Sequence, residues 1–149
     1  MTAVRRAVAA DAAALAPLLG ALGYPAAPAE VAGRLAALLA SPRDAVLVAE
    51  EDGGGAVLGV LALHWGALLH LPEPIARIGS LVVAEEARGR GVGARLVREA
   101  AELARAAGCA ELELTTGLRR HAAHAFYAGL GFEWRSLRFV RTVDGMEGA

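Results

Sequence analysis

The order of apolar and polar positions divides the chain into stretches with helical spacing and stretches with strand-like spacing. Apolar residues recur at helical spacing in four stretches, which predicts helices over residues 12–22, 29–40, 92–107 and 120–130. Continuous apolar runs or strict alternation predict strands over residues 4–8, 45–50, 57–65, 75–83 and 111–115, with final strand material over 132–143. The predicted order of elements is β-α-α-β-β-β-α-β-α-β, which is an α+β fold.

The connections between the predicted strands indicate how they pair. Residues 45–83 hold three strands without a helix between them, and a glycine-rich turn joins the first two, which predicts antiparallel pairing. A helix separates the strand at 75–83 from the strand at 111–115, so these two are predicted to pair in parallel through a right-handed crossover. We therefore expect a mixed, mostly antiparallel sheet flanked by helices.

Composition bounds the class of protein without identifying it. The chain has 149 residues, is 56% hydrophobic and 21% charged, and shows no repeat or low-complexity tail, which predicts one globular domain over residues 1–149. The net charge of −1 lacks the basic excess that nucleic-acid binders show, so no nucleic-acid partner is expected.

Cysteine content and hydropathy bear on the compartment. The single cysteine, Cys109, allows no intramolecular disulfide, which fits a reducing environment. The most apolar stretch, residues 56–71, is too short to span a bilayer, and the N-terminus lacks a signal-peptide pattern. A cytoplasmic protein without a membrane partner is therefore expected.

The segment between the strand at 75–83 and the next helix carries the clearest chemical signal. Gly89, Gly91 and Gly93 alternate where strand becomes helix, and without Cβ atoms they let backbone N–H groups approach a ligand closely. The first N–H groups of a helix lack intrahelical partners, and together with the helix dipole they form a site for an anion. Arg88 and Arg90 add positive charge beside it, so a phosphate or pyrophosphate group is the predicted ligand.

Other interpretations of this segment are weaker. The run Gly89-x-Gly91-x-x-Ala94 matches the loose dinucleotide-binding fingerprint, with Glu111 or Glu113 about twenty residues further on, which keeps a nucleotide-linked oxidoreductase as an alternative. However, residues 84–88 intervene between the strand and the glycines, and three antiparallel strands come first. No Gly-Lys-Ser/Thr follows, which excludes a P-loop. A plain turn needs one glycine rather than three alternating ones.

The spacing Arg88-x-x-Gly91-x-Gly93 resembles the acyl-CoA pyrophosphate loop of the GNAT superfamily of N-acetyltransferases. A second motif lies downstream, where residues 123–132 read A-H-A-F-Y-A-G-L-G-F and resemble the A-x-x-F-Y-x-x-L-G-F element of the same superfamily. The two motifs occur in the family's order with a predicted strand between them. The resemblance implies a single-domain GNAT-like fold, in which a bulged fourth strand splays from the fifth and leaves a V-shaped gap.

The same resemblance implies that the chain uses acetyl-CoA as its acyl donor. The pantetheine arm is expected to fill the gap and to bind the backbone groups of Leu81, Val82 and Val83. The pyrophosphate is expected to bind the glycine-rich segment, whose matching residues are Arg88, Gly89, Arg90, Gly91, Val92, Gly93 and Ala94. Arg120 is a further candidate contact, either for the phosphates of CoA or for an anionic group of the acceptor.

For catalysis, Tyr127 matches the tyrosine that protonates the departing CoA thiolate in much of the superfamily. Because a phenol has a pKa of about 10 and a thiol of about 8.5, full transfer is slightly uphill, and a strong hydrogen bond is the alternative form of this role. Many relatives place a carboxylate just before the Leu-Val-Val run, but this chain has Gly79 and Ser80 there. The remaining candidate bases are His64, His70, Glu73 and a water held by Ser80.

Within the superfamily, Leu63-His64, Ile78-x-x-Leu81-Val82-Val83 and the run over 113–127 are similar to the aminoalkylphosphonate N-acetyltransferase-like branch. That branch acetylates small primary amines bearing an anionic group, for which Arg77, Arg120 and His121 are candidate contacts. The resemblance implies an N-acetyltransferase that transfers the acetyl group of acetyl-CoA to a small primary amine by direct attack, without a metal. A non-catalytic acyl-CoA-binding module and acetylation of a peptide or protein amine stay open as alternatives, as does a homodimer.

Overall fold

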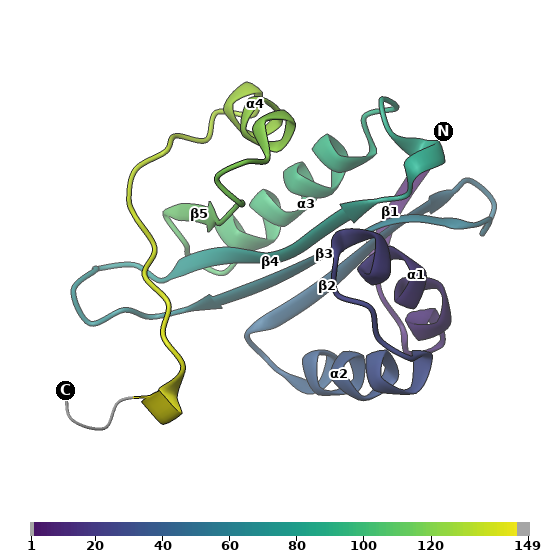
Figure 1. Ribbon diagram of the computed structural model, residues 1–149, viewed down its shortest axis with the longest axis horizontal. Coiled ribbons are helices and arrows are strands. Elements are labelled where there is room, and N and C mark those ends of the chain that lie inside the picture. Colours follow the sequence, from purple (N-terminus) through teal and green to yellow (C-terminus); the bar gives the residue numbers. More distant parts are fainter. Residues whose placement is uncertain (1, 146–149) are drawn as a thin grey trace. The chain divides into compact units, whose positions relative to one another are not determined.

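The computed structural model describes residues 2–145. The chain groups into two compact units, one ending at Thr115 and the other beginning at Thr116, and each unit is described by itself. The described part of the first unit holds a five-stranded sheet and three α-helices, and that of the second holds one α-helix (Figure 1).

The sheet follows the order of the chain, with neighbouring strands hydrogen-bonded in sequence. Its strands are β1 (Thr2–Arg6), β2 (Asp44–Glu51), β3 (Val57–Gly66), β4 (Ile75–Val83) and β5 (Glu111–Leu114). The first four strands pair antiparallel, and β4 pairs with β5 in parallel. The mixed, mostly antiparallel sheet predicted from the connections is confirmed.

Helices cover both faces of this sheet. On one side lie α1 (Ala12–Leu22) and α2 (Pro28–Ala40), and on the other lies α3 (Val92–Ala106) (Figure 1). A sheet covered on both faces needs strands that are apolar on both faces. The continuous apolar runs of β2 and β3 supply them, and Val48, Leu61 and Leu63 are at most 1% exposed.

Gly59 of β3 determines how closely α3 packs on the sheet. A Cβ atom at this position would lie 3.2 Å from Leu96 and 3.3 Å from Val92 of α3, and 3.1 Å from the carbonyl oxygen of Val82. Because these distances are tighter than ordinary packing contacts, glycine is what allows α3 to approach β3 and β4 this closely. The start of α3 is thereby held next to the end of β4.

The first strand ends earlier than the pattern predicts. The apolar run predicts a strand over residues 4–8, but β1 ends at Arg6 because the chain turns at Val8, whose N–H donates to the Asp11 carboxylate at 2.8 Å. Asp11 is buried and accepts two further hydrogen bonds from the Arg5 guanidinium, at 2.8 and 2.9 Å. The Arg5 hydrogen bonds, with a smaller contribution from Val8, hold the pKa of Asp11 below its ordinary value.

The second unit departs from the prediction after its helix. The helix α4 (His121–Gly129) agrees with the pattern, but residues 132–142 form neither helix nor strand, so the prediction of strand material over 132–143 is wrong. A strand needs a neighbouring strand with which to exchange hydrogen bonds, and residues 116–145 contain none. The apolar side chains that suggested a strand are exposed instead, namely Trp134, Leu137, Phe139 and Val140.

Candidate functional site

The two halves of β4 differ in their pairing. Residues 75–78 have register partners on both β3 and β5. Over residues 79–83 the pairing with β3 continues, whereas the pairing with β5 stops at Ile78, opposite Leu114. Because β5 ends at Leu114, the second half of β4 has an open edge toward it. This is the gap between strands 4 and 5 that the resemblance implied.

A β-bulge marks the change from one half to the other. Leu63 pairs with Ile78 and Ala62 pairs with Ser80, so Gly79 has no partner residue on β3. Gly79 is exposed, and a Cβ atom there would meet nothing within 4 Å. The bulge expected in this strand is therefore present, and it faces open space.

The open edge presents the backbone groups of Leu81 and Val83. Ala84 donates its N–H to the carbonyl oxygen of Leu58 on β3 at 2.7 Å, and backbone groups point alternately to the two sides of an antiparallel strand. The backbone groups of Val82 therefore face β3, in agreement with its carbonyl oxygen lying beside Gly59. Those of Leu81 and Val83 face the gap. Since buried N–H and C=O groups need partners, an extended chain with amide groups can bind this edge as a neighbouring strand would.

The glycine-rich segment follows directly after this edge. A 3₁₀ turn over Glu85–Ala87 leads into it, and Gly89 and Gly91 both have a φ of 77°. Residues with a side chain rarely adopt this left-handed conformation, which explains glycine at both positions. Ala87 and Val92, at 0% and 1% exposure, anchor the two ends of the segment in the core, and residues 88–91 between them are exposed.

The start of α3 is left without a capping side chain. Gly91 is its N-cap residue and makes no side-chain cap hydrogen bond, so the first-turn N–H groups, those of Val92, Gly93 and Ala94, lack a capping partner. Together with the positive end of the helix dipole, these groups attract an anion. Arg90 pairs with Glu51 at 3.0 Å, and among the described residues no ion pair engages Arg88. The seven predicted phosphate contacts thus form one segment at the end of β4.

A row of four polar side chains crosses the sheet at the paired half of β4. Asp44 of β2 is the register partner of His64 of β3, His64 is the partner of Arg77 of β4, and Arg77 is the partner of Glu113 of β5. Register partners on neighbouring strands point to the same face of a sheet. Asp44 Oδ1 lies 3.0 Å from His64 Nδ1, and Arg77 donates to Glu113 at 3.3 Å. We call these four residues the polar row.

A cavity of about 150 Å³ lies beside the polar row. Its lining comes from the adjoining ends of β3, β4 and β5 and from the loop between β3 and β4, namely His64, Gly66, Ala67, Leu68, Ile75, Arg77 and Glu113. Ser80 pairs with Ala62, two residues before His64, so Ser80 lies on the same face, roughly 7 Å along the sheet. The structure thus brings two predicted catalytic residues together, whereas His70 and Glu73 lie in the exposed loop.

Tyr127 and Arg120 belong to the second unit. The Tyr127 ring packs edge-to-face on Phe126 and Phe132, with 5.2 and 5.7 Å between ring centroids. Burial raises the pKa of the Tyr127 phenol above its ordinary value, and the positive charge of Arg120 opposes this with a smaller effect. The hydroxyl therefore keeps its proton at neutral pH and can donate it, which the predicted acid role requires.

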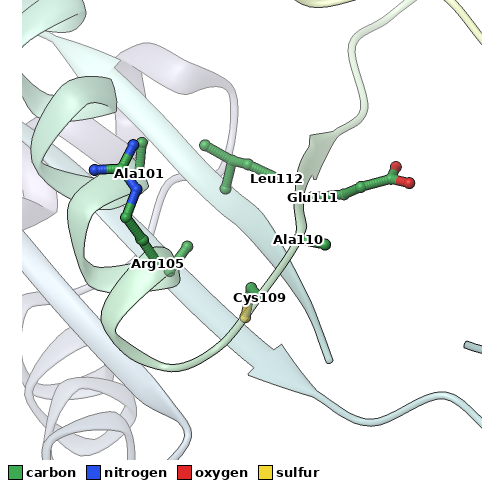
Figure 2. A pocket seen from close by; sticks show the side chains of 7 residues that line it. Ala101, Arg105, Cys109, Ala110, Glu111 and Leu112 are labelled. Carbon is green, nitrogen blue, oxygen red and sulfur yellow. The ribbon is translucent and has the colours of Figure 1, made fainter. Parts of the chain in front are cut away.

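A second cavity, of about 180 Å³, is lined in part by Cys109 (Figure 2). Figure 2 shows Cys109 in the connection between α3 and β5, with Ala101 and Arg105 on the helix before it. The 15 residues of α3 place this cavity roughly 22 Å from the glycine-rich segment. Burial raises the pKa of the Cys109 thiol, which disfavours the thiolate that a nucleophile needs. Neither the location nor the chemistry favours a covalent role for Cys109.

Asp44 is a member of the polar row that was not among the predicted site residues. The predicted hairpin between β2 and β3 contains the signal, because antiparallel pairing counted back from its turn places Asp44 near His64. The register shifts between Ala49 and Glu50, however, so the turn alone does not fix which residue faces His64. Asp44 also lies one residue before the strand predicted over 45–50, where a carboxylate has a plain interpretation as a solvated strand end.

Among the described residues, no group of three or more His, Cys, Asp or Glu side chains could hold a metal ion. In the same part of the chain, no helix has both the length and the apolar character needed to cross a membrane.

The sequence has recognisable relatives. The profile described as the Acetyltransferase (GNAT) family matches residues 16–132. The aminoalkylphosphonate N-acetyltransferase of Salmonella typhimurium (strain LT2) is 37% identical over 89 residues, which make up 60% of this chain and 58% of that protein. The matched part therefore spans less than two thirds of the relative's own length.

Solved structures resemble most of the chain. A candidate acetyltransferase from Agrobacterium tumefaciens str. C58 has a TM-score of 0.83 and 32% identity, covering 94% of this chain and 99% of its own. The protein AAC(6')-Iy, solved in complex with the bisubstrate analogue CoA-S-monomethyl-acetylneamine, has a TM-score of 0.82, covering 95% of this chain and 98% of its own. At 18% identity, this second likeness concerns the fold alone.

Proposed function

This chain belongs to the GNAT acetyltransferase family, and from that membership we propose that it is an N-acetyltransferase that transfers the acetyl group of acetyl-CoA to a primary amine of a small molecule. Residues 1–149 form one acetyltransferase domain in this proposal. The observation that carries it is the open backbone edge of β4, which runs directly into the uncapped, glycine-rich start of α3.

Acetyl-CoA fits these two features because it combines an extended amide-containing arm with a diphosphate. The backbone groups of Leu81 and Val83 supply hydrogen bonds for the amides of the pantetheine arm, while Val82, bound to β3, keeps this edge in place. The N–H groups of the first turn of α3 and the guanidinium of Arg88 attract the diphosphate. Gly89 and Gly91 are exposed, with open space around the position of a Cβ atom. Their left-handed backbone, which a side chain would strain, shapes the segment in front of the helix start.

Direct attack by the amine accounts for the transfer. The nitrogen of a neutral amine forms a bond to the thioester carbonyl carbon, the carbon–sulfur bond breaks, and the sulfur departs with the electron pair as the CoA thiolate. Tyr127 donates a hydrogen bond, or its proton, to this thiolate. Burial keeps the phenol protonated by raising its pKa, which makes full proton transfer more uphill and favours the strong hydrogen bond. The proton lost by the amine passes to His64, or to a water held by Ser80. The raised pKa of the Cys109 thiol disfavours a covalent relay instead.

A small acceptor is supported by the Salmonella relative, which is named for aminoalkylphosphonates, and by the modest cavity of about 150 Å³ beside His64. Arg77 is the candidate contact for an anionic group of such an acceptor. Its guanidinium already donates to Glu113 at 3.3 Å and to Thr115 at 3.4 Å. An anionic acceptor therefore has to compete with Glu113 for Arg77, and Arg120 is the second candidate cation.

The proposal is tested by calorimetric titration with acetyl-CoA, followed by an assay of CoA thiol release with a panel of amines. The panel contains aminoalkylphosphonates, other anionic amines, cationic amines and peptides with a free N-terminus. We expect acetyl-CoA to bind and at least one small amine to stimulate thiol release. Binding without amine-dependent release favours the acyl-CoA-binding module, and release with peptides alone favours a peptide acceptor. A chain that does not bind acetyl-CoA contradicts the proposal entirely.

A further inference from the structure

The polar row contains an arrangement that the proposed function leaves unexplained. Gly79 and Ser80 provide no carboxylate at the bulge of β4, so a base for the acceptor amine has to come from elsewhere on this face. His64 is the imidazole on this face, and a carboxylate holds it from the side away from the cavity. Resting on the proposed function, we propose that Asp44 is a positioning residue that orients His64 to take the proton of the acceptor amine.

The carboxylate of Asp44 is itself held in place. Its Oδ1 lies 3.0 Å from His64 Nδ1, and its Oδ2 accepts a hydrogen bond from the Ser41 hydroxyl at 2.6 Å. The Ser41 oxygen in turn accepts the N–H of Arg43 at 3.3 Å. The Asp44 side chain is 14% exposed, whereas that of His64 is 60% exposed. A fixed, mostly buried carboxylate thus holds an exposed imidazole.

This pairing determines which nitrogen of His64 can accept a proton. An ionised carboxylate only accepts hydrogen bonds, so the contact assigns the Nδ1–H tautomer and leaves the lone pair on Nε2. A Cβ atom at Gly66 would lie 4.0 Å from Nε2, and Gly66 lines the same cavity as His64. The accepting nitrogen is therefore on the cavity side, where the acceptor amine is proposed to bind.

Among the described residues, no arginine competes with His64 for the Asp44 carboxylate. Arg77 follows His64 in the polar row, but its guanidinium donates to Glu113 and Thr115 on the far side. No hydrogen bond joins Arg77 to Asp44 in the described structure. Asp44 consequently has two partners, a hydroxyl and an imidazole, and its orienting effect is directed at His64.

Nitrogen-15 NMR spectroscopy first tests whether Asp44 orients the His64 imidazole or has only a structural role. The nitrogen-15 chemical shifts of the imidazole report its tautomer, and the His64→Gln variant identifies which signals belong to His64. At alkaline pH, where imidazoles are neutral, we expect His64 to hold its proton on Nδ1 in the wild-type chain and to lose this preference in Asp44→Asn. Wild-type signals that show the Nε2–H form or an even mixture overturn the proposal.

Kinetics then test whether Asp44 acts through His64. With the amine of the panel that gives the highest rate, we expect His64→Gln to lower kcat/KM by about 100-fold or more. Asp44→Asn, which leaves the imidazole in place without its orienting partner, should lower it by a smaller factor. Because Asp44 acts through the imidazole, the double variant should be no slower than His64→Gln alone. The control is Glu102→Gln, the same acid-to-amide change on the exposed surface of α3, which should leave kcat/KM unchanged.

If Asp44→Asn lowers kcat/KM by the same factor with and without His64, the positioning role is contradicted. It is also contradicted if Asp44→Asn leaves kcat/KM unchanged in the wild-type background. Asn has nearly the shape of Asp, and His64 is exposed, so neither variant should unfold the chain. If the wild-type chain binds acetyl-CoA but acetylates no amine, the proposed function fails. The tautomer measurement still decides the role of Asp44 toward His64 in that case.

Discussion

The two halves of β4 use the same strand in opposite ways. Over residues 75–78, β3 and β5 satisfy the backbone on both edges, and the side chain of Arg77 takes part in the polar row. Over residues 79–83, one edge has no β5 partner and the backbone itself is available for binding. One bulged glycine and the early end of β5 produce this difference. The comparison shows how a single strand can carry a proposed acceptor side and a proposed donor side.

The open half would be a liability if it stayed uncovered, because an exposed strand edge invites pairing with other chains. The glycine-rich segment and the bulge make sense together when a ligand covers this edge. The start of α3 then binds the anionic part of this ligand, and the open edge of β4 pairs with its extended part. Substitutions in one half, or outside both, therefore show whether the other half responds.

The largest effect is expected on stability, from proline at Val82, a residue of the open half whose N–H faces β3. Val82→Pro removes an N–H that faces β3 and leaves a buried carbonyl without its donor, which should lower the free energy of unfolding by about 2–4 kcal/mol. Leu81→Pro removes an N–H that faces the gap, where proline is tolerated as on an edge strand. It should weaken acetyl-CoA binding with a much smaller loss of stability. Urea unfolding and calorimetry measure both, and equal destabilisation by the two variants contradicts the open edge.

The next effect is a loss of turnover that leaves the binding of acetyl-CoA intact. Tyr127→Phe should lower kcat by about 100-fold, because it removes a proton donor, while the affinity for acetyl-CoA stays nearly unchanged. Steady-state kinetics and calorimetry provide the two readouts. Tyr24→Phe is the matched control, since Tyr24 lies in the first unit and is 71% exposed. Unchanged turnover in Tyr127→Phe removes this residue from the mechanism.

A smaller effect is expected at β1, the opposite edge of the sheet. Asp11→Asn breaks the pair with Arg5 and should lower the free energy of unfolding by about 1–2 kcal/mol at neutral pH. This is less than the loss of a fully buried pair costs, because the Arg5 side chain is 34% exposed and solvent screens its charge. The pKa of Asp11 is lowered in the folded chain, so its contribution is complete above the ordinary value of 3.8 and is lost as the pH falls below it.

Unfolding curves at neutral and acid pH therefore should converge for wild type and Asp11→Asn as the pH falls. Acetyl-CoA affinity should be the same for both chains, because neither half of β4 is touched. A difference in stability that persists unchanged into strong acid contradicts the assigned ion pair.

The smallest effect is expected in the paired half. Glu113→Gln leaves the charge of Arg77 uncompensated, and because the pair is solvent-accessible the change is worth about 0.5–1 kcal/mol. The KM of an anionic amine should fall by about 2- to 5-fold and that of a cationic amine should rise by a similar factor. A shift of both KM values in the same direction shows that this row does not contact the acceptor's charged group.

Local pattern was sufficient to predict most of the fold. The helix predicted over 12–22 and the strand predicted over 75–83 coincide with α1 and β4. Helical periodicity is encoded within the first segment, and apolar, β-branched residues such as Ile75, Ile78 and Val82 within the second. For Gly89 and Gly91 the pattern predicts close approach of the backbone to a ligand. The φ of 77° at both adds a second, conformational reason for glycine that the pattern does not predict.

Features that depend on distant partners could not be predicted in this way. Residues 132–143 have the apolar character of a strand but lack a partner strand in their unit. The early end of β1 depends on the burial of Asp11 against Arg5, and the contact of Asp44 with His64 depends on a shifted register. In each case a tertiary contact, not local propensity, decides the outcome.

Amide hydrogen exchange in β4, followed residue by residue with and without saturating acetyl-CoA, tests the central claim most directly. The amide of Val82, which faces β3, should be protected in both states. The amides of Leu81 and Val83 should exchange rapidly in the free chain and become protected when acetyl-CoA is bound. Leu81 and Val83 amides that exchange at the same rate in both states, while calorimetry confirms binding, would contradict the account.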